Sequence, residues 1–223
     1  MIINDIFDID VDMVNSSDKP LPSKEAIIFA SIITGFGLLS ALFISGLAVL
    51  LYIIFWIIGF LYNWKFKEKG FFGNLFVSFS VGFTIIFGGI VVYNPWKTAV
   101  LICSLMIFLF DLSEEIAADT MDIEGDKKRN IKSIPILIGR KKSLYISSSL
   151  LFLEVILTYL PVILGIFGVS YLILISLTNM IILFLGIKLL KSQSIKKGRI
   201  YVRLLYLIAL PGMVFSIISN FIF

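Results

Sequence analysis

The sequence predicts an all-α fold, a multi-pass transmembrane bundle, and three observations lead to it. Hydrophobic residues make up 59% of the 223 positions and charged residues only 15%, whereas soluble domains are usually about a quarter charged. Seven apolar segments follow one another, each near the ~20 residues that a helix needs to cross a bilayer. The basic residues gather in alternate gaps between these segments.

The seven segments are expected to be helices, because a backbone in lipid must satisfy its own hydrogen bonds. Their approximate bounds are 26–44, 47–62, 74–92, 97–113, 143–163, 168–190 and 200–222. No repeat or low-complexity linker separates them. We therefore expect residues 1–223 to form a single membrane-embedded domain.

The distribution of Lys and Arg predicts the orientation of the bundle. Of the 19 basic residues, 18 lie before the first segment or in the gaps around 63–73, 114–142 and 188–203. Lys97 is the exception. By the positive-inside rule, the basic side faces the cytoplasm and the C-terminus lies outside the cell membrane. The net charge of +4 therefore needs no nucleic-acid partner.

The composition also limits the chemistry. The chain has no histidine, which excludes histidine metal ligands and general bases and leaves carboxylates as the main metal-ligand candidates. Its single cysteine, Cys103, allows no intrachain disulfide. The acidic start, Met1 to Asp5, lacks the basic n-region of a signal peptide.

Eleven of the 15 acidic residues fall in two stretches, 5–12 and 111–126, both on the predicted cytoplasmic side. At about 100° per helical residue, Asp5, Asp8 and Asp12 would share an arc of about 60°. The second stretch would place five carboxylates within about 80°: Asp111, Glu115, Asp119, Asp122 and Asp126.

Like charges on one helix face repel each other, and carboxylates beside hydrocarbon are costly. Each stripe therefore predicts a bound cation. Mg²⁺ is the natural candidate, because it prefers oxygen ligands and commonly bridges carboxylates to substrate phosphates.

Simpler interpretations stay open at this stage. Residues 4–12 could be a solvated acidic tail, and residues 111–126 could be a solvated helix end paired with the lysines that follow. Finding both stretches on one membrane face, each in helical phase, favours binding. A cation transporter is a further alternative, but its acids should spread through the bilayer, and only Glu154 clearly lies inside a segment.

The residue patterns of the two acidic stretches resemble the aspartate motifs of the UbiA prenyltransferase family, N-D-x-x-D-x-x-x-D and D-x-x-D-x-E-G-D. Here they read Asn4-Asp5-Ile-Phe-Asp8-Ile-Asp-Val-Asp12 and Asp119-Thr-Met-Asp122-Ile-Glu-Gly-Asp126. Of the two motifs, the second is most similar to that of the archaeal members that prenylate geranylgeranylglyceryl phosphate. The resemblance covers nearly the whole chain.

Two further matches follow in the family's order. Lys19-Pro-Leu-Pro-Ser23 is similar to R-P-I-P-S. Tyr62, the basic stretch Lys65 to Lys69 and Gly73-Asn74-Leu are similar to Y-x-x-x-x-K…G-N-L.

The resemblance implies Mg²⁺-dependent transfer of a geranylgeranyl group from geranylgeranyl diphosphate to geranylgeranylglyceryl phosphate, in archaeal ether-phospholipid synthesis. The implied catalytic residues are Asn4, Asp8, Asp12, Asp122 and Asp126. The implied metal ligands are Asp5, Asp8, Asp12, Asp119, Asp122 and Asp126. The implied substrate-binding residues are Lys19, Tyr62, Lys65, Lys67, Asn74, Lys127, Lys128 and Arg129.

The chain departs from the family pattern in two places. Family members usually have nine transmembrane helices, with the first motif at the end of the second helix. The expectation is thus seven full helices and the end of a preceding one, with roughly the first one to two helices absent and the start codon internal. Before the second motif the family has R-E-I-x-K-D, but here Glu114 replaces the arginine and Ala118 the lysine.

Other functions remain as alternatives. The acceptor could be aromatic, such as 4-hydroxybenzoate or a naphthoate in quinone biosynthesis. The chain could also be an inactive, truncated paralogue.

Overall fold

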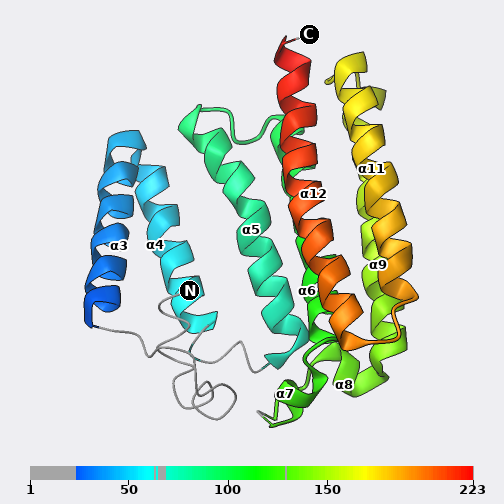
Figure 1. Cartoon of the computed structure of the whole chain (residues 1–223). Helices are drawn as coiled ribbons and strands as arrows, with labels where there is room; N and C mark the ends of the chain where they lie inside the picture. Colours follow the sequence, from blue (N-terminus) through cyan, green and yellow to red (C-terminus); the bar gives the residue numbers. More distant parts are fainter. Residues whose placement is uncertain (1–23, 63, 65–68, 129, 223) are drawn as a thin grey trace.

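The structure is a computed structural model that describes residues 24–62, 64, 69–128 and 130–222. Within these residues, seven long helices run roughly alongside one another (Figure 1), and each corresponds to a predicted apolar segment. They are α3 (Lys24–Ile44), α4 (Gly46–Leu61), α5 (Phe71–Val91), α6 (Thr98–Asp119), α9 (Arg140–Leu157), α11 (Val169–Leu190) and α12 (Ile195–Ile222). Three short helices connect them: α7 (Ile123–Lys128), α8 (Ile134–Ile138) and α10 (Leu160–Ile163).

The described residues confirm the predicted all-α, membrane-spanning class. By length and composition, five helices can cross a membrane, namely α3, α5, α9 continued by α10, α11 and α12. Helix α4 is apolar but has only 16 residues. Helix α6 is long enough, with 22 residues, but acidic residues occupy its last third.

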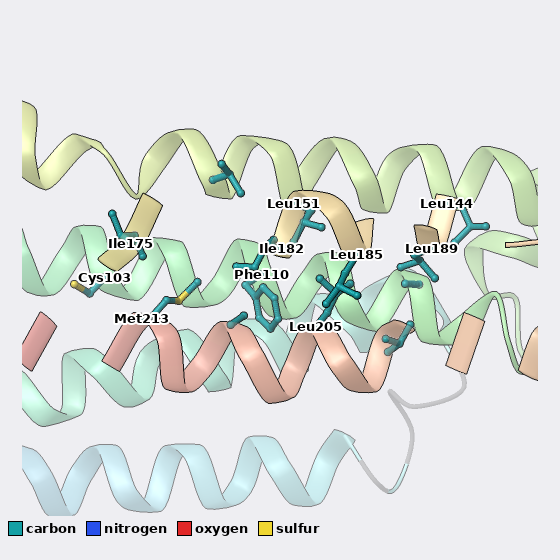
Figure 2. Packing of buried hydrophobic residues seen from close by; sticks show 14 of the residues in the cluster. Cys103, Phe110, Leu144, Leu151, Ile175, Ile182, Leu185, Leu189, Leu205 and Met213 are labelled. Carbon is teal, nitrogen blue, oxygen red and sulfur yellow. The ribbon is translucent and has the colours of Figure 1, made fainter. Parts of the chain in front are cut away.

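The largest hydrophobic core lies between α6, α9, α11 and α12. Figure 2 shows Phe110 of α6 beside Ile182 and Leu185 of α11 and Leu205 of α12. Phe110 is only 2% exposed and Ile182 is fully buried. The outward faces of these helices carry exposed Leu, Ile and Phe side chains, as expected for helices whose solvent is lipid.

Small residues and hydroxyls join the central helices. Ser113 of α6 and Ser147 of α9 each donate to the other's carbonyl oxygen at 2.8 Å. Ser104 donates to the carbonyl oxygen of Gly82 at 2.8 Å, and a Cβ at Gly82 would come within 2.9 Å of Phe108. Close approach over small residues and interhelical hydrogen bonds are typical of packing in membranes. Together they fix α5, α6 and α9 relative to one another.

Helices α3 and α4 form a hairpin set apart from the main core (Figure 1). Tyr52 donates to the carbonyl oxygen of Thr34 at 2.7 Å and holds the two helices together. Ser45 caps α4 by accepting from the backbone N–H of Ala48. The ring of Phe55 lies 4.5 Å from that of Phe83 and connects the hairpin to α5.

A sharp backbone turn at Gly70 fixes where α5 begins. Gly70 has a φ of +56°, a region that L side chains rarely adopt. A Cβ at this position would collide with the carbonyl oxygen of Lys132. Glycine therefore lets the start of α5 lie directly against the loop between α7 and α8, at the end of the bundle where those short helices lie (Figure 1).

A buried carboxyl group lies in α9, far from the acidic motifs in sequence. Glu154 is fully buried, and neither of its carboxyl oxygens has a hydrogen-bond partner in the described part of the chain. Asn179 donates to Thr158 Oγ1 at 2.8 Å, but its own Oδ1 likewise lacks a donor among the described residues. Glu154 is one helical turn from Thr158, whose N–H donates to the Glu154 carbonyl oxygen.

Replacing Glu154 with glutamine should therefore stabilise the fold. An unsatisfied buried polar group costs about 1–3 kcal/mol, and glutamine removes the charge while adding two donors. We expect Glu154→Gln to raise the free energy of unfolding in mixed micelles. Glu154→Ala, which leaves a cavity, should lower it. A Gln variant as destabilised as the Ala variant would show that Glu154 has a partner that needs its carboxylate.

Candidate functional site

Three of the four acidic residues of α6 occupy its last third, at the end of the bundle that also carries α7 and α8 (Figure 1). Asp111 lies in the apolar part of the helix, whereas Glu114, Glu115 and Asp119 lie beyond the predicted segment 97–113. Asp111 is 6% exposed, and both glutamates are partly buried. These carboxyl groups are thus held in the bundle rather than in solvent.

Asp119 is bound by a side chain of the neighbouring helix. Asn74 Nδ2 donates to Asp119 Oδ2 at 2.8 Å, and Asn74 itself is only 6% exposed. Asn74 lies in the first turn of α5, where its N–H donates to the Gly70 carbonyl oxygen. The turn at Gly70 therefore places an amide donor against the last residue of α6.

Ser78 follows Asn74 by one helical turn and is the α5 neighbour of Asp111. Ser78 Oγ and Asp111 Oδ2 are both buried, and neither makes a well-formed hydrogen bond within the described residues. The face of α5 that carries Asn74 and Ser78 thus follows the acidic face of α6. A carboxylate oxygen left without a donor is suited to a cation or to a ligand group.

The helix ends sooner than the sequence pattern suggested. Helix α6 stops at Asp119, a turn follows, and α7 begins at Ile123. The expectation of one continuous helical stripe from Asp111 to Asp126 is therefore wrong beyond Asp119. The turn is closed by the N–H of Asp122 donating to the Asp119 carbonyl oxygen at 3.2 Å.

Asp126 nevertheless remains close to the other two motif aspartates. Its N–H donates to the Asp122 carbonyl oxygen at 2.9 Å, and its side chain is 7% exposed. Asp122 is exposed. A Cβ at Gly125 would come within 2.6 Å of Asp122 Oδ1, so glycine leaves room for that carboxylate. The turn and the first turn of α7 bring three carboxylates within electrostatic range.

Burial and mutual repulsion shift the proton affinities of these groups. Burial raises the pKa of Asp119 to about 6, the hydrogen bond from Asn74 opposes this, and the charges of Asp126 and Asp122 add to it. Burial, followed by the charges of Glu114 and Asp111, raises the pKa of Glu115 to about 8. The site therefore favours a positive charge, whether a proton or a metal ion.

The donor set suits Mg²⁺, which takes carboxylate and amide oxygens. In the described residues, however, no three Asp, Glu or Cys side chains lie close enough together to enclose a metal ion. The described carboxylates alone therefore do not make up a complete set of ligands for a metal ion. The first acidic cluster, with Asn4, Asp5, Asp8 and Asp12, lies outside the described residues.

The predicted substrate-binding residues are only partly described. Lys19, Lys65, Lys67 and Arg129 lie outside the described residues. Asn74 is at the site, although its contact is with Asp119. Lys127 and Lys128 are exposed in the last turn of α7. Tyr62 follows α4 and is partly buried.

Sequence reasoning missed Ser78 and Gly125 as members of the site. Ser78 could have been found from its spacing, because it lies four residues after Asn74 and so on the same face of α5. Gly125 stands inside the quoted motif, but its role depends on the turn that ends α6, and helical phase did not predict that turn.

A mostly apolar cavity of about 400 Å³ lies between α4 and α5. Its lining residues are Leu51, Tyr52, Phe55, Trp56, Gly59, Ser80, Phe83, Thr84 and Phe87. A cavity of this size and character can take an apolar chain.

Comparison with known proteins places the chain in a family. The profile of the UbiA prenyltransferase family matches residues 1–208. Digeranylgeranylglyceryl phosphate synthase of Methanocaldococcus jannaschii is 38% identical over 199 residues, which are 86% of this chain and 69% of that protein. The enzyme of the same name from Thermococcus kodakarensis is 34% identical over 197 residues, covering 86% and 70%.

Two solved structures are similar. One, from a study of digeranylgeranylglyceryl phosphate synthase in membranes, has a TM-score of 0.77 and 36% identity, over 98% of this chain and 79% of that chain. The other, the apo structure of a UbiA homologue from Aeropyrum pernix K1, has a TM-score of 0.80 and 19% identity, over 99% and 84%. At that identity the second supports the fold alone. The motifs, the helical bundle and these matches agree: the chain belongs to the UbiA prenyltransferase family and is an integral membrane prenyltransferase.

Proposed function

We propose that this prenyltransferase moves a geranylgeranyl group from geranylgeranyl diphosphate to the free hydroxyl of geranylgeranylglyceryl phosphate, in archaeal ether-lipid synthesis. The observation that carries the proposal is the placement of Asp119 within electrostatic range of Asp122 and Asp126 at one end of an apolar bundle. Relatives 32–38% identical that bear the name digeranylgeranylglyceryl phosphate synthase support this choice of substrates.

Mg²⁺ is the proposed cofactor, and when bound it neutralises the diphosphate as the bond to the prenyl carbon breaks. Asp122 and Asp126 are the proposed ligands on the described side, with Asp119 as a further ligand oriented by Asn74. Asn4, Asp5, Asp8 and Asp12 are proposed to complete the site from the first motif. Lys19, Lys65 and Lys67 are proposed to bind diphosphate oxygens.

The reaction also requires that water be excluded, and the apolar bundle can do this. Loss of diphosphate leaves an allylic cation that water would trap, so the tail and the reacting carbon need a dry site. The cavity between α4 and α5 is proposed to take part of the prenyl chain, because aromatic and aliphatic side chains line it.

The acceptor's phosphate needs cations of its own near the carboxylates. Lys127 and Lys128 follow Asp126 directly and are exposed, so they can reach a headgroup at the membrane surface. Arg129 is proposed to act with them. The positive-inside distribution supports a cytoplasmic active site with the C-terminus outside.

The acceptor can be tested with membranes that contain the chain and labelled geranylgeranyl diphosphate. We expect a labelled lipid phosphate with geranylgeranylglyceryl phosphate and no product with 4-hydroxybenzoate or a naphthoate. Product from an aromatic acceptor alone would replace the proposed substrate while leaving the family intact. Absence of product with every acceptor would point to an inactive chain.

Removing one motif carboxylate should abolish transfer without unfolding the bundle. We expect Asp122→Ala to lower the Mg²⁺-dependent rate at least about 100-fold, as when a group that stabilises the transition state is lost. Asp122 is exposed, so the thermal midpoint should change little. The matched control is Glu25→Ala, an exposed acid in the first turn of α3. Equal losses in the two variants would contradict the assignment.

The stability of the metal-free protein should depend on pH in a defined direction. The folded-state pKa values of Asp119 and Glu115, about 6 and about 8, lie above their ordinary values of 3.8 and 4.5. Between pH about 4 and 8 the folded chain therefore binds more protons than the unfolded chain. The free energy of unfolding should fall as pH rises, by at most about 1.4 kcal/mol per pH unit per group.

Thermal unfolding in detergent at pH 5, 7 and 9 checks this dependence. In a chelator, the thermal midpoint should fall as pH rises. In the Glu115→Gln variant, the midpoint should change less above pH 6. Mg²⁺ should reduce the fall, because it replaces the protons as the compensating charge. A midpoint that rises across the same window in the chelator would contradict the burial of these carboxyl groups.

A further inference from the structure

Met121 lies in the turn that follows α6, directly before Asp122, which is a proposed metal ligand. Its side chain is 3% exposed and belongs to the large core cluster. Its N–H donates to the Ala118 carbonyl oxygen at 2.8 Å, but its own carbonyl oxygen faces away from α6, toward α12. The place of Asp122 therefore depends on what holds Met121.

Arg199, in the first turns of α12, holds the backbone of this residue. Its Nη2 donates to the Met121 carbonyl oxygen at 3.1 Å, across 78 positions of sequence. A guanidinium is always charged and binds a carbonyl oxygen more strongly than a neutral donor does. One contact thus connects the C-terminal half of the bundle to the turn that carries Asp122.

Arg140, the first residue of α9, holds the side chain of Met121. Its Nη2 lies 3.7 Å from Met121 Sδ and 3.0 Å from Ser192 Oγ, and its Nη1 donates to the Ser192 carbonyl oxygen at 2.8 Å. Ser192 is buried in the turn between α11 and α12. The contacts with Ser192 therefore hold the Arg140 guanidinium in place beside Met121.

Gly198, next to Arg199, makes this approach possible. A Cβ at Gly198 would collide with Met121 Sδ and Cε, and it would lie 3.5 Å from Arg140 Nη2. The starts of α9 and α12 and the turn after α11 thus converge on one methionine. None of these segments carries a residue of the acidic motifs.

We propose that Arg199 and Arg140 are positioning residues that set the geometry of the second aspartate motif through Met121. This inference rests on the proposed function, in which Asp122 and Asp126 hold Mg²⁺. Neither arginine is proposed to touch the metal or the substrates. They act by fixing the turn between α6 and α7, so that the carboxylates are preorganised before the metal arrives.

The sign of the effect separates positioning from charge. A cation near a metal site repels the metal, so removing Arg199 would strengthen metal binding if its charge alone mattered. If Arg199 fixes the turn, its removal weakens metal binding despite the lost repulsion. Metal affinity therefore distinguishes the two roles, whereas a loss of activity would not.

The test uses the full chain in lipid nanodiscs and Mn²⁺ as the probe, with free Mn²⁺ followed by electron paramagnetic resonance. We expect Arg199→Gln to raise the Mn²⁺ Kd about tenfold, which is the lower end for residues that orient metal ligands. Arg199→Lys keeps a charged donor but loses the planar guanidinium with its several N–H groups. It should raise the Mn²⁺ Kd only about two- to threefold.

Two further variants control the measurement. Arg203→Gln removes another exposed arginine, one turn further along α12, and should leave the Kd unchanged. Gly198→Ala displaces Met121 without removing a charge and should weaken Mn²⁺ binding as Arg199→Gln does. Thermal midpoints in a chelator verify that each variant is folded, and if Arg199→Gln does not fold, Gly198→Ala and Arg199→Lys decide.

Each outcome has one meaning. Equal or tighter Mn²⁺ binding by folded Arg199→Gln, or unchanged binding by Gly198→Ala, overturns the positioning role. Asp122→Ala tests the metal site itself: if this variant leaves Mn²⁺ binding intact, the proposed metal site is wrong. If Asp122→Ala loses Mn²⁺ and the Arg199 variants do not, only this inference fails.

Discussion

Carboxyl groups held at the end of an apolar bundle impose the main constraint on this protein. Asp119, Asp122 and Asp126 lie within electrostatic range of one another, and Glu115 and Asp111 continue the acidic face into the bundle. Burial disfavours their charged forms, and each charge disfavours its neighbours. Such a group is stable only when the fold holds it rigidly and a cation can compensate it. The remaining architecture supplies the first of these conditions.

Rigidity comes from the helices around α6. Asn74 of α5 binds Asp119, the paired serines Ser113 and Ser147 lock α6 to α9, and Arg199 reaches Met121 from α12. The large core between α6, α9, α11 and α12 supports these contacts (Figure 2). The α3–α4 hairpin instead meets α5 through a small separate core around Ala41, Ala48 and Ile90 and through aromatic contacts, and it leaves a cavity there. The arrangement combines a fixed polar end with an apolar space suited to a prenyl chain.

The sequence was sufficient for the membrane class and for the family. Seven apolar segments became seven long helices, because length and hydropathy determine which stretches can cross lipid. The quoted motifs identified the family that the comparisons confirm. Helical phase failed at Asp119, where α6 ends and the chain turns into α7. The contact of Arg199 with the carbonyl oxygen of Met121 in this turn spans 78 positions of sequence, so no local pattern could predict it. The proximity of Ser78 to Asp111 likewise depends on how α5 packs against α6.

Binding of inorganic diphosphate tests the central claim most directly, because it needs neither the prenyl chain nor the acceptor. Equilibrium dialysis of labelled diphosphate against the protein in nanodiscs should show saturable binding with Mg²⁺. Binding should be lost in a chelator and in an Asp122→Asn variant. Diphosphate bound equally well in the chelator, or by the variant, would contradict a carboxylate-held metal site at the end of α6.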